Sequence, residues 1–346
     1  MAVTDIVKER IGGLTVGKPI IKDALGVLAV HSDRVGKVEY ITYDEALKNE
    51  SITVTEINEG GSVPELKLEN KGNQRVLIMD GEQLIGAKQN RILNTTVLVE
   101  AKDTLIIPVT CVEQGRWSYS DGKYAGTRDM SGSRFQMKAV SRRRKAEAVQ
   151  ANLASDRGYA GDQSETWDEL HGSIMGLNVN SPTSAMEDIY VSTEDELKAF
   201  LDAFSLDQFD QSDSIVGAVF TIEGKILGMD ASDKHSTIEK NWEKLISSYA
   251  IEALRSKKEG NVDLDEVSKF FKDILEADMN IFPPPGLGKD VRFQSDSVVG
   301  SGLVVDDEVV HIYAFNTEGQ EKDESNTPRS TMTSFRDRLR GKRDQQ

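Results

Sequence analysis

Two stretches in the second half of the chain share one pattern and decide the fold: SIVGAVFTIEGKILGMDA (Ser214–Ala231) and SVVGSGLVVDDEVVHIYA (Ser297–Ala314). Each begins with Ser, a branched residue, Val and Gly, and then has two apolar runs joined by a short turn. The turns are Glu223-Gly224 and Asp306-Asp307. Turn formers between two apolar runs are typical of β-hairpins. We therefore expect two antiparallel hairpins, which are either copies of one duplicated unit or unrelated hairpins that look alike.

The first third of the chain also favours β-structure. Short runs rich in branched residues are separated by Gly- and Asn-rich turns; they are Gly26–Val30, Ser51–Ile57, Glu65–Asn70, Arg75–Asp80, Thr95–Glu100 and Thr104–Thr110. The stretch Arg75–Ala87 resembles the two later hairpins, with Asp80-Gly81 at its turn. We expect the last two runs to form a hairpin that turns at residues 100–103.

Helical patterns begin beyond Ser118–Arg134, a Gly/Ser-rich stretch that we expect to be a long loop. Apolar residues then recur at helical spacing in the segments Arg134–Asn152, Ser164–Leu177, Ser192–Phe204, Ser236–Ala253 and Asp263–Leu275. Thr193 and Ser236 each precede a glutamate by three residues, as in a helix cap. The sequence thus predicts an α+β fold, with antiparallel β-hairpins and four or five helices mainly in the middle and second half.

These elements all lie within residues 1–316. We expect one α+β domain there, with two β-rich halves of about 1–117 and 118–316 as the alternative. Residues 317–346 are polar, and Phe335 and Leu339 are their only strongly apolar positions. Such a segment buries too little surface to offset its ordering entropy, so we expect a disordered tail.

The charge of the chain argues against some partners. Its 346 residues include 42 Lys and Arg and 58 Asp and Glu, which gives a formal net charge of -16. A surface this acidic repels phosphate backbones and anionic lipids. We therefore expect neither nucleic acid nor membrane as a partner. The charged N-terminus lacks the apolar core of a signal peptide, which favours a cytoplasmic protein.

Familiar signatures of catalysis are missing from the sequence. The single cysteine, Cys111, excludes an internal disulfide and a multi-cysteine zinc site, and the four histidines share no metal-ligand spacing. Phosphate-loop, dinucleotide-fold and nucleophile-elbow motifs are also missing. We expect no metal and no cofactor, a structural role for His311, and a buried, unreactive Cys111.

A polar constellation remains, in two segments that each end a predicted strand. The first contains Lys88, Gln89, Asn90, Arg91 and Asn94, and the second contains Glu113, Gln114, Arg116 and Trp117. If the strands between them pair, the two segments meet. Arginines bind phosphate or carboxylate in bidentate fashion, amides recognise base edges or ribose hydroxyls, and an indole stacks on a ring. Glu113 is our candidate general base. The alternative is a structural salt-bridge network.

At these residues the sequence resembles a known family. The stretches LIMDGEQLIGAKQNRILNTT, PVTCVEQGRW, IVGAVF and GLGKDVR are similar to the ADP-ribosylglycohydrolase- and rhodanese-phosphatase-superfamily-associated protein domain family. The resemblance covers most of Gly12 to Phe315. It implies a role near the metabolism of ADP-ribose-like or NAD-derived nucleotides, but it implies no particular reaction.

Together these observations predict that the protein binds a nucleotide-derived small molecule related to ADP-ribose or NAD. Whether it also processes that molecule is an open question. Two other classes stay open: a non-catalytic binding or sensor module, and a structural or assembly protein. Whether the chain is an enzyme, and whether it forms a homo-oligomer, are not decided by the sequence.

Overall fold

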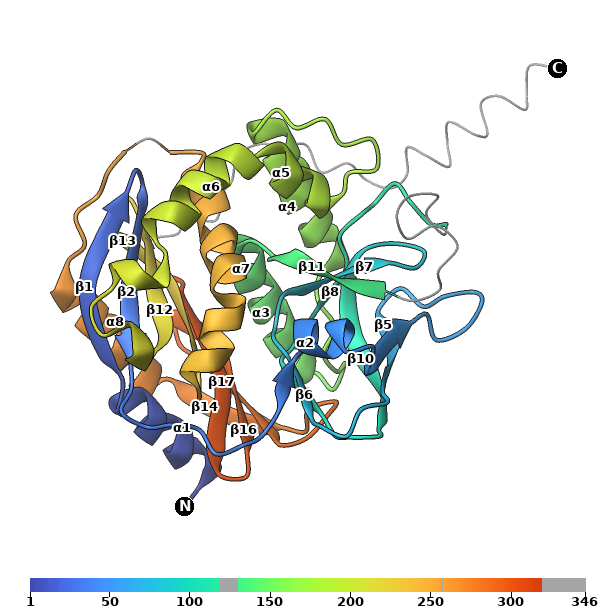
Figure 1. The fold of residues 1–346 in the computed structure, drawn as a ribbon, viewed down its shortest axis with the longest axis horizontal. Helices are drawn as coiled ribbons and strands as arrows, with labels where there is room; N and C mark the ends of the chain where they lie inside the picture. The colour runs from blue at the N-terminus through green and yellow to red at the C-terminus, as the bar shows by residue number, and fades with distance from the viewer. Residues whose placement is uncertain (119–129, 257, 319–346) are drawn as a thin grey trace. The chain divides into compact units, whose positions relative to one another are not determined.

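The computed structural model describes residues 1–118, 130–256 and 258–318. Contacts group Met1–Asn316 into one compact unit, shown as a ribbon in Figure 1. Its fold class is α+β with antiparallel sheets, as predicted. Most of the predicted tail, residues 319–346, lies outside the described residues.

The largest sheet has eight strands, all antiparallel, in the order β1-β2-β12-β13-β17-β16-β15-β14. The strands are β1 (Thr15–Lys22), β2 (Leu25–His31), β12 (Ile215–Ile222), β13 (Lys225–Ser232), β14 (Asp278–Phe282), β15 (Lys289–Gln294), β16 (Val298–Val305) and β17 (Glu308–Asn316). Both hairpins expected from the repeated pattern are present. The β12–β13 hairpin turns at Glu223-Gly224, and the β16–β17 hairpin turns at Asp306-Asp307.

The two hairpins also occupy equivalent places in this sheet. β13 pairs with β17 at the middle, and each half continues outward through one hairpin partner and two more strands. A helix precedes the outer strands of each half: α1 (Val3–Gly12) before β1, and α8 (Leu264–Glu276) before β14. Asp230 pairs with Tyr313 across the middle, and these residues hold matching positions in the two stretches. The arrangement favours a duplicated unit of one helix and four strands.

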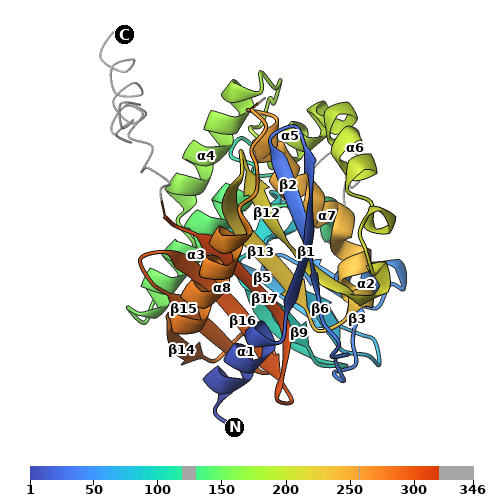
Figure 2. The same ribbon diagram turned by 90° about the vertical axis from the view of Figure 1, so that its left-hand side faces the viewer.

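Helices cover both faces of the eight-stranded sheet (Figure 2). α1 and α8 contact each other on one face, and α7 (His235–Ala253) packs on the other. Because successive side chains of a strand point to opposite faces, Val27 joins the core under α7, whereas Leu28 joins the core under α1 and α8. This burial on both faces explains why these strands are nearly continuous apolar runs.

A long segment between β2 and β12 forms two smaller sheets and several helices. The six-stranded sheet has the order β11-β7-β8-β10-β5-β4, and the three-stranded sheet has the order β3-β6-β9. Their strands are β3 (Ile41–Thr42), β4 (Ile52–Thr55), β5 (Glu65–Asn70), β6 (Val76–Ile78), β7 (Glu82–Gly86), β8 (Arg91–Leu93), β9 (Val97–Val99), β10 (Thr104–Cys111) and β11 (Met130–Gln136). Side chains of both sheets and of α2 (Tyr43–Lys48) share one apolar core, which includes Leu68, Ile78 and Leu93.

The remaining helices are α3 (Ala139–Leu153), α4 (Gln163–Gly176), α5 (Met186–Ser192) and α6 (Glu194–Ala203), and two 3₁₀ turns follow at Leu206–Gln208 and Ser212–Ser214. The five helices expected from periodicity correspond to α3, α4, α6, α7 and α8. Among the described residues α1, α2 and α5 are additional. Two of these are short, and helices of one or two turns carry little periodic signal.

Two expected strand pairings are wrong. The Asp80-Gly81 turn does not close a hairpin, because β6 and β7 belong to different sheets; β7 pairs instead with β8 and β11. β9 does not pair with β10: it pairs with β6, whereas β10 pairs with β5 and β8. Apolar patterns locate a strand, but its partner is chosen by contacts with distant segments.

Two helix starts and one loop also differ from expectation. The Thr193 hydroxyl does not cap α6 but donates to the Ile189 carbonyl oxygen at 2.9 Å, and α7 begins at His235, before Ser236. Met130–Gln136 forms strand β11 instead of the expected loop and helix start, since pairing with β7 overrides local sequence preference. Residues 119–129 of the expected loop lie outside the described residues.

Candidate functional site

Pairing of β8 with β10 brings the two predicted polar segments together. Arg91 at the start of β8 lies opposite Cys111 at the end of β10. Residues 87–90 form the turn between β7 and β8, where Gly86 and Ala87 have positive φ angles of 124° and 45°. The predicted convergence is therefore present, although it comes from a different strand pair than expected. We call Glu56, Lys88–Arg91 and Glu113–Trp117 the polar cluster.

Glu113 and Arg116 form the centre of the polar cluster. Arg116 Nη2 donates to Glu113 Oε2 at 2.6 Å and to Asn90 Oδ1 at 3.0 Å, and its Nη1 donates to the Ala87 carbonyl oxygen at 2.8 Å. Glu113 Oε2 also accepts from the Asn90 backbone N–H at 3.2 Å, and Oε1 accepts from the Thr183 hydroxyl at 3.0 Å. Both carboxylate oxygens are therefore occupied by donors within the protein.

Arg91 is fully buried beside this pair. Its Nη1 donates to the backbone and side-chain oxygens of Gln89 at 2.9 and 3.1 Å, and its Nη2 lies 3.8 Å from Glu56 Oε1. Burial lowers the pKa of Arg91, and the nearby Cys111 and Glu56 oppose that change. Each arginine thus has a carboxylate partner. Removing Arg91 would leave the buried Glu56 carboxylate without that ion-pair partner.

The polar cluster reaches the surface at several residues, among them Trp117, Gln114 and Lys88. The Trp117 side chain is 46% exposed, Gln114 is exposed and Lys88 is half-buried. The Lys88 ammonium and the Arg91 guanidinium carbon lie 5.7 and 5.4 Å from the Trp117 ring centroid, which is within cation–π range. The Lys88 ammonium, which lies over the Trp117 ring, also donates to the Glu59 carbonyl oxygen. The Trp117 ring and Lys88 form the part of the cluster that a ligand can reach from solvent.

Asn94 and Cys111 have other surroundings. The Asn94 amide donates to the Tyr159 carbonyl oxygen at 3.0 Å and accepts from the Thr110 hydroxyl at 2.8 Å. These bonds connect two parts of the chain and do not involve the polar cluster. Cys111 is buried, and burial raises the pKa of its thiol to about 11. A thiol with that pKa remains protonated at neutral pH, which agrees with the expected unreactive cysteine.

The family model of the ARG and Rhodanese-Phosphatase-superfamily-associated Protein domain matches residues 13–315. The chain belongs to this family. The matched range includes both halves of the eight-stranded sheet and the whole polar cluster, and it agrees with the resemblance seen in the sequence. No curated protein and no solved structure matches the chain.

A buried charged network in this family member was not anticipated from the sequence. Arg142 of α3 makes a bidentate ion pair with Asp230, at 2.9 and 2.7 Å, and its Nε lies 3.4 Å from Asp80. Lys145 donates to Asp80 at 2.8 Å, and His311 Nε2 lies 3.5 Å from Asp230. Burial lowers the pKa of Lys145 to about 8, and Asp80 opposes that change.

The sequence contained a signal for this network. Asp230, Asp290, Arg292 and His311 are ionisable residues inside otherwise apolar strands, and such residues are buried with partners. Arg292 donates to Asp290 at 2.7 Å and to the Thr95 hydroxyl at 2.8 Å. His311 Nδ1 lies 2.7 Å from the Thr96 hydroxyl, which agrees with the expected structural histidine.

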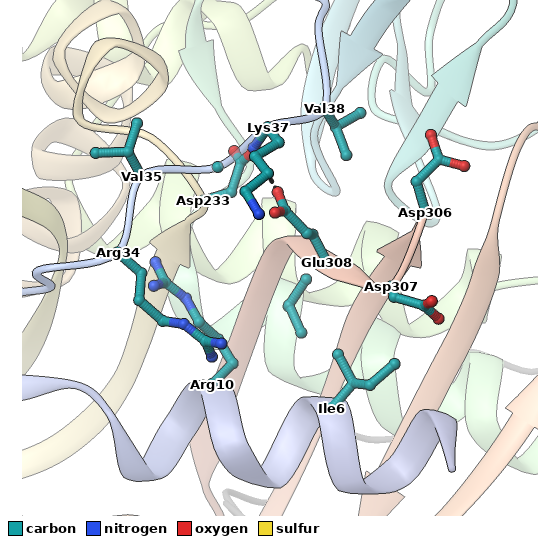
Figure 3. Close-up of a pocket in the computed structure, with 12 residues that line it drawn as sticks. Ile6, Arg10, Arg34, Val35, Lys37, Val38, Asp233, Asp306, Asp307 and Glu308 are labelled. Atoms are coloured by element: carbon teal, nitrogen blue, oxygen red, sulfur yellow. Dashed lines mark hydrogen bonds between the residues drawn. The ribbon is translucent and has the colours of Figure 1, made fainter. Parts of the chain in front are cut away.

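A cavity of about 560 Å³ lies elsewhere, at the end of the central strands (Figure 3). Its walls come from α1, residues 34–38, Asp233 and the β16–β17 turn. The sequence did not indicate this cavity because its walls come from four distant segments.

Among the described residues no group of three His, Cys, Asp or Glu side chains is arranged to hold a metal ion. None of the described helices has the length and apolar character that a membrane crossing requires.

Proposed function

We propose that the polar cluster binds a phosphate-bearing, nucleotide-derived small molecule of the ADP-ribose or NAD-related kind. The observation that carries this proposal is the half-exposed Trp117 ring with the Lys88 ammonium 5.7 Å from its centroid. A base or nicotinamide ring can stack on the indole, and a lysine ammonium beside it attracts phosphate. The family's name, which refers to ADP-ribosylglycohydrolase and rhodanese-phosphatase superfamilies, supports the same class of ligand.

The hydrogen bonds of Glu113 favour a site that binds its ligand without catalysing a reaction. A general base needs a free lone pair within reach of a substrate proton. The Glu113 oxygens instead accept from Arg116, Thr183 and the backbone of Asn90. In this proposal Glu113 and Arg116 hold the turn at residues 87–90, and Gln89 and Asn90 shape it, so that Lys88 and Trp117 face the ligand. Exposed Gln114 lies at the edge of the site.

The proposal is tested by thermal unfolding with ADP-ribose and adenosine. A ligand at a hundredfold excess over Kd stabilises the folded state by about 2.7 kcal/mol, which corresponds to a melting-temperature rise of several degrees. ADP-ribose should produce this rise, and adenosine, which lacks phosphate, should produce much less. Trp117→Ala should weaken binding of both by roughly tenfold, whereas Lys88→Gln should weaken only ADP-ribose.

Lys71→Gln is the matched control, because Lys71 is an exposed lysine of the same segment, and its one ion pair within the described part of the chain is a 3.9 Å contact with Glu69. It should bind ADP-ribose like the wild type. Variants of Arg91 are unsuitable because that side chain is fully buried and its loss should unfold the cluster. If ADP-ribose and NAD leave the melting temperature unchanged, or if Trp117→Ala binds them normally, the polar cluster is a structural salt-bridge network.

A further inference from the structure

The cavity beside α1 has the size and lining of a small-molecule site. Its volume of about 560 Å³ falls within the usual range for ligand pockets. Apolar side chains of Ile6, Val35, Val38 and Val309 form part of the wall. None of its lining residues belongs to the polar cluster, so this cavity requires its own explanation.

One part of the lining is basic. Arg10 Nη1 donates to the Ser32 hydroxyl at 2.7 Å, and Nη2 donates to the Ser232 carbonyl oxygen at 2.6 Å, while its buried Nε has no hydrogen-bond partner. Arg34 lies near it and makes a 3.0 Å ion pair with Glu9, with 63% of the Arg34 side chain still exposed. Arg10 is therefore held in place, and Arg34 can turn toward a bound anion.

Another part of the lining is acidic. Asp306 and Asp307 form the two-residue β16–β17 turn with φ angles of 50° and 61°, and Glu308 follows. Asp306 is paired with Arg75 at 2.9 Å, whereas Asp307 has no ion-pair partner among the described residues. Asp233 Oδ2 is buried and has no hydrogen-bond partner. Figure 3 shows Asp307 on the side of the cavity away from Arg34, whereas the Glu308 carboxylate lies between them and accepts a hydrogen bond from the Lys37 backbone N–H at 2.5 Å.

This mixed charge selects among ligand classes. The lining has the basic residues Arg10, Arg34 and Lys37 and the acidic residues Asp233, Asp306, Asp307 and Glu308. A polyphosphate or other multiple anion would meet more acidic than basic side chains. A metal ion is disfavoured, because no suitable ligand group is found in the described parts of the chain. A molecule with an anionic end and a cationic end satisfies both parts of the lining.

We propose that this cavity binds a small zwitterion, such as a short peptide, whose carboxylate contacts Arg10 and Arg34 and whose ammonium contacts Asp307. The apolar body of the ligand then lies against Ile6 and Val309. Pairing of both ends matters because a buried charge without a partner is costly. This site is separate from the polar cluster and does not depend on its proposed ligand.

The test uses three probes that share the leucyl-glycine body and differ in which end is charged. Leucyl-glycine carries both charges, leucyl-glycinamide carries only the ammonium, and N-acetyl-leucyl-glycine carries only the carboxylate. Binding to the full chain is measured by calorimetry and by the shift in melting temperature. We expect leucyl-glycine to bind roughly tenfold more tightly than either of the others, since each lacks one charged contact.

Three variants locate the binding. Arg34→Gln should weaken leucyl-glycine by several-fold and leave leucyl-glycinamide unchanged. Asp307→Asn, which keeps a residue type that tolerates positive φ, should do the reverse, weakening the zwitterion and leaving N-acetyl-leucyl-glycine unchanged. Asp202→Asn, on the exposed face of α6, is the charge-matched control and should bind all three like the wild type, as should Trp117→Ala.

Two results would overturn the proposal. One is equal or undetectable binding of the three probes by the wild-type chain. The other is preferential binding of leucyl-glycine that survives in both Arg34→Gln and Asp307→Asn, because the peptide would then bind elsewhere. Failure here leaves the ADP-ribose experiment unaffected, and failure of that experiment leaves this one unaffected.

Discussion

The two carboxylate oxygens of Asp233 have different surroundings. Oδ1 accepts hydrogen bonds from the Tyr40 and Ser232 hydroxyls, whereas Oδ2 is buried without a partner next to Gly36. Burial raises the pKa of Asp233 to about 6. In the unfolded chain the group ionises near its ordinary pKa of about 4, so the folded state holds its proton longer.

This raised pKa predicts a pH dependence with a definite sign. Between about pH 4 and pH 6 the unfolded chain loses the Asp233 proton first, so the free energy of unfolding falls as pH rises. The contribution is on the order of 3 kcal/mol and is complete above the folded pKa. Asp233→Asn removes this titration. Urea unfolding at several pH values should show a shallower decline in the variant than in the wild type over that range.

The comparison must use the difference between the two proteins, because other groups also titrate. Burial raises the pKa of Glu82 to about 7, which adds a decline of the same sign in both proteins. Asp202→Asn, at an exposed position, should follow the wild-type curve. Parallel curves for wild type and Asp233→Asn would contradict the assignment of the decline to this carboxyl.

The sequence predicted which residues gather at the polar cluster, but it did not predict which of them are exposed to solvent. Arg91, Glu113, Arg116 and Trp117 converge as the sequence indicated, because residue chemistry and strand ends can be read locally. Only Trp117 among these four is substantially exposed. The partner that neutralises Arg91 is Glu56, a residue distant in sequence that no local pattern connects to it.

At the level of the strand, one glycine recurs at the same position of both repeated hairpins, Gly217 in β12 and Gly300 in β16. A Cβ added to Gly217 would lie 2.1 Å from the Asp230 carbonyl oxygen, and one added to Gly300 would lie 2.3 Å from the Tyr313 carbonyl oxygen. Asp230 and Tyr313 are themselves equivalent residues. Both hairpins therefore need glycine for the same reason, a close approach of the neighbouring backbone.

These contacts predict that Gly217→Ala and Gly300→Ala each destabilise the fold by about 1–3 kcal/mol or more, because the neighbouring backbone must shift. Gly302→Ala is the control in the same strand as Gly300, since its added Cβ would meet nothing closer than 3.6 Å. It should be neutral or slightly stabilising. Urea unfolding measures all three, and equal effects at Gly300 and Gly302 would show that the close approach is unimportant.

Helices and strands were predictable where a long periodic pattern marks them. The prediction failed where a segment becomes a strand only through pairing with a distant strand. The apolar stripe of α7 and the paired apolar runs of the two hairpins can be recognised in the sequence alone. The start of α8 can also be recognised, because Asp263 caps it by accepting from the Asp265 backbone N–H at 2.9 Å. β11 was missed, since its Gly/Ser-rich sequence becomes a strand only through pairing with β7. β14 and β15 were also missed, because they flank a proline-rich stretch that indicates a break in regular structure.

At the scale of the whole molecule, the buried charged network joins distant parts of Met1–Asn316. Asp80 comes from the inserted segment, Arg142 comes from α3, and Asp230 comes from the middle of the eight-stranded sheet. All three side chains are fully buried. Burial alone would raise the pKa of Asp230, but Arg142 and His311 outweigh it and lower the pKa to about 2. The carboxylate therefore stays ionised, with its charge matched inside the protein.

Arg142 should accordingly be far more important than its neighbour Arg143 on α3, and its importance should depend on Asp230. Arg142→Met leaves a buried carboxylate unpaired and should lower the free energy of unfolding by about 3–5 kcal/mol. The double variant with Asp230→Asn removes both charges and should lose clearly less than the sum of the two single losses. Among the described residues Arg143 forms an i,i+4 ion pair with Glu147, and Arg143→Met should lose about 1 kcal/mol or less. Urea unfolding of the wild type, Arg142→Met, Asp230→Asn and the double variant gives the four free energies of a double-mutant cycle. Losses that add to within about 0.5 kcal/mol would mean that Arg142 and Asp230 stabilise the fold independently, and the network would then be a set of separate contacts.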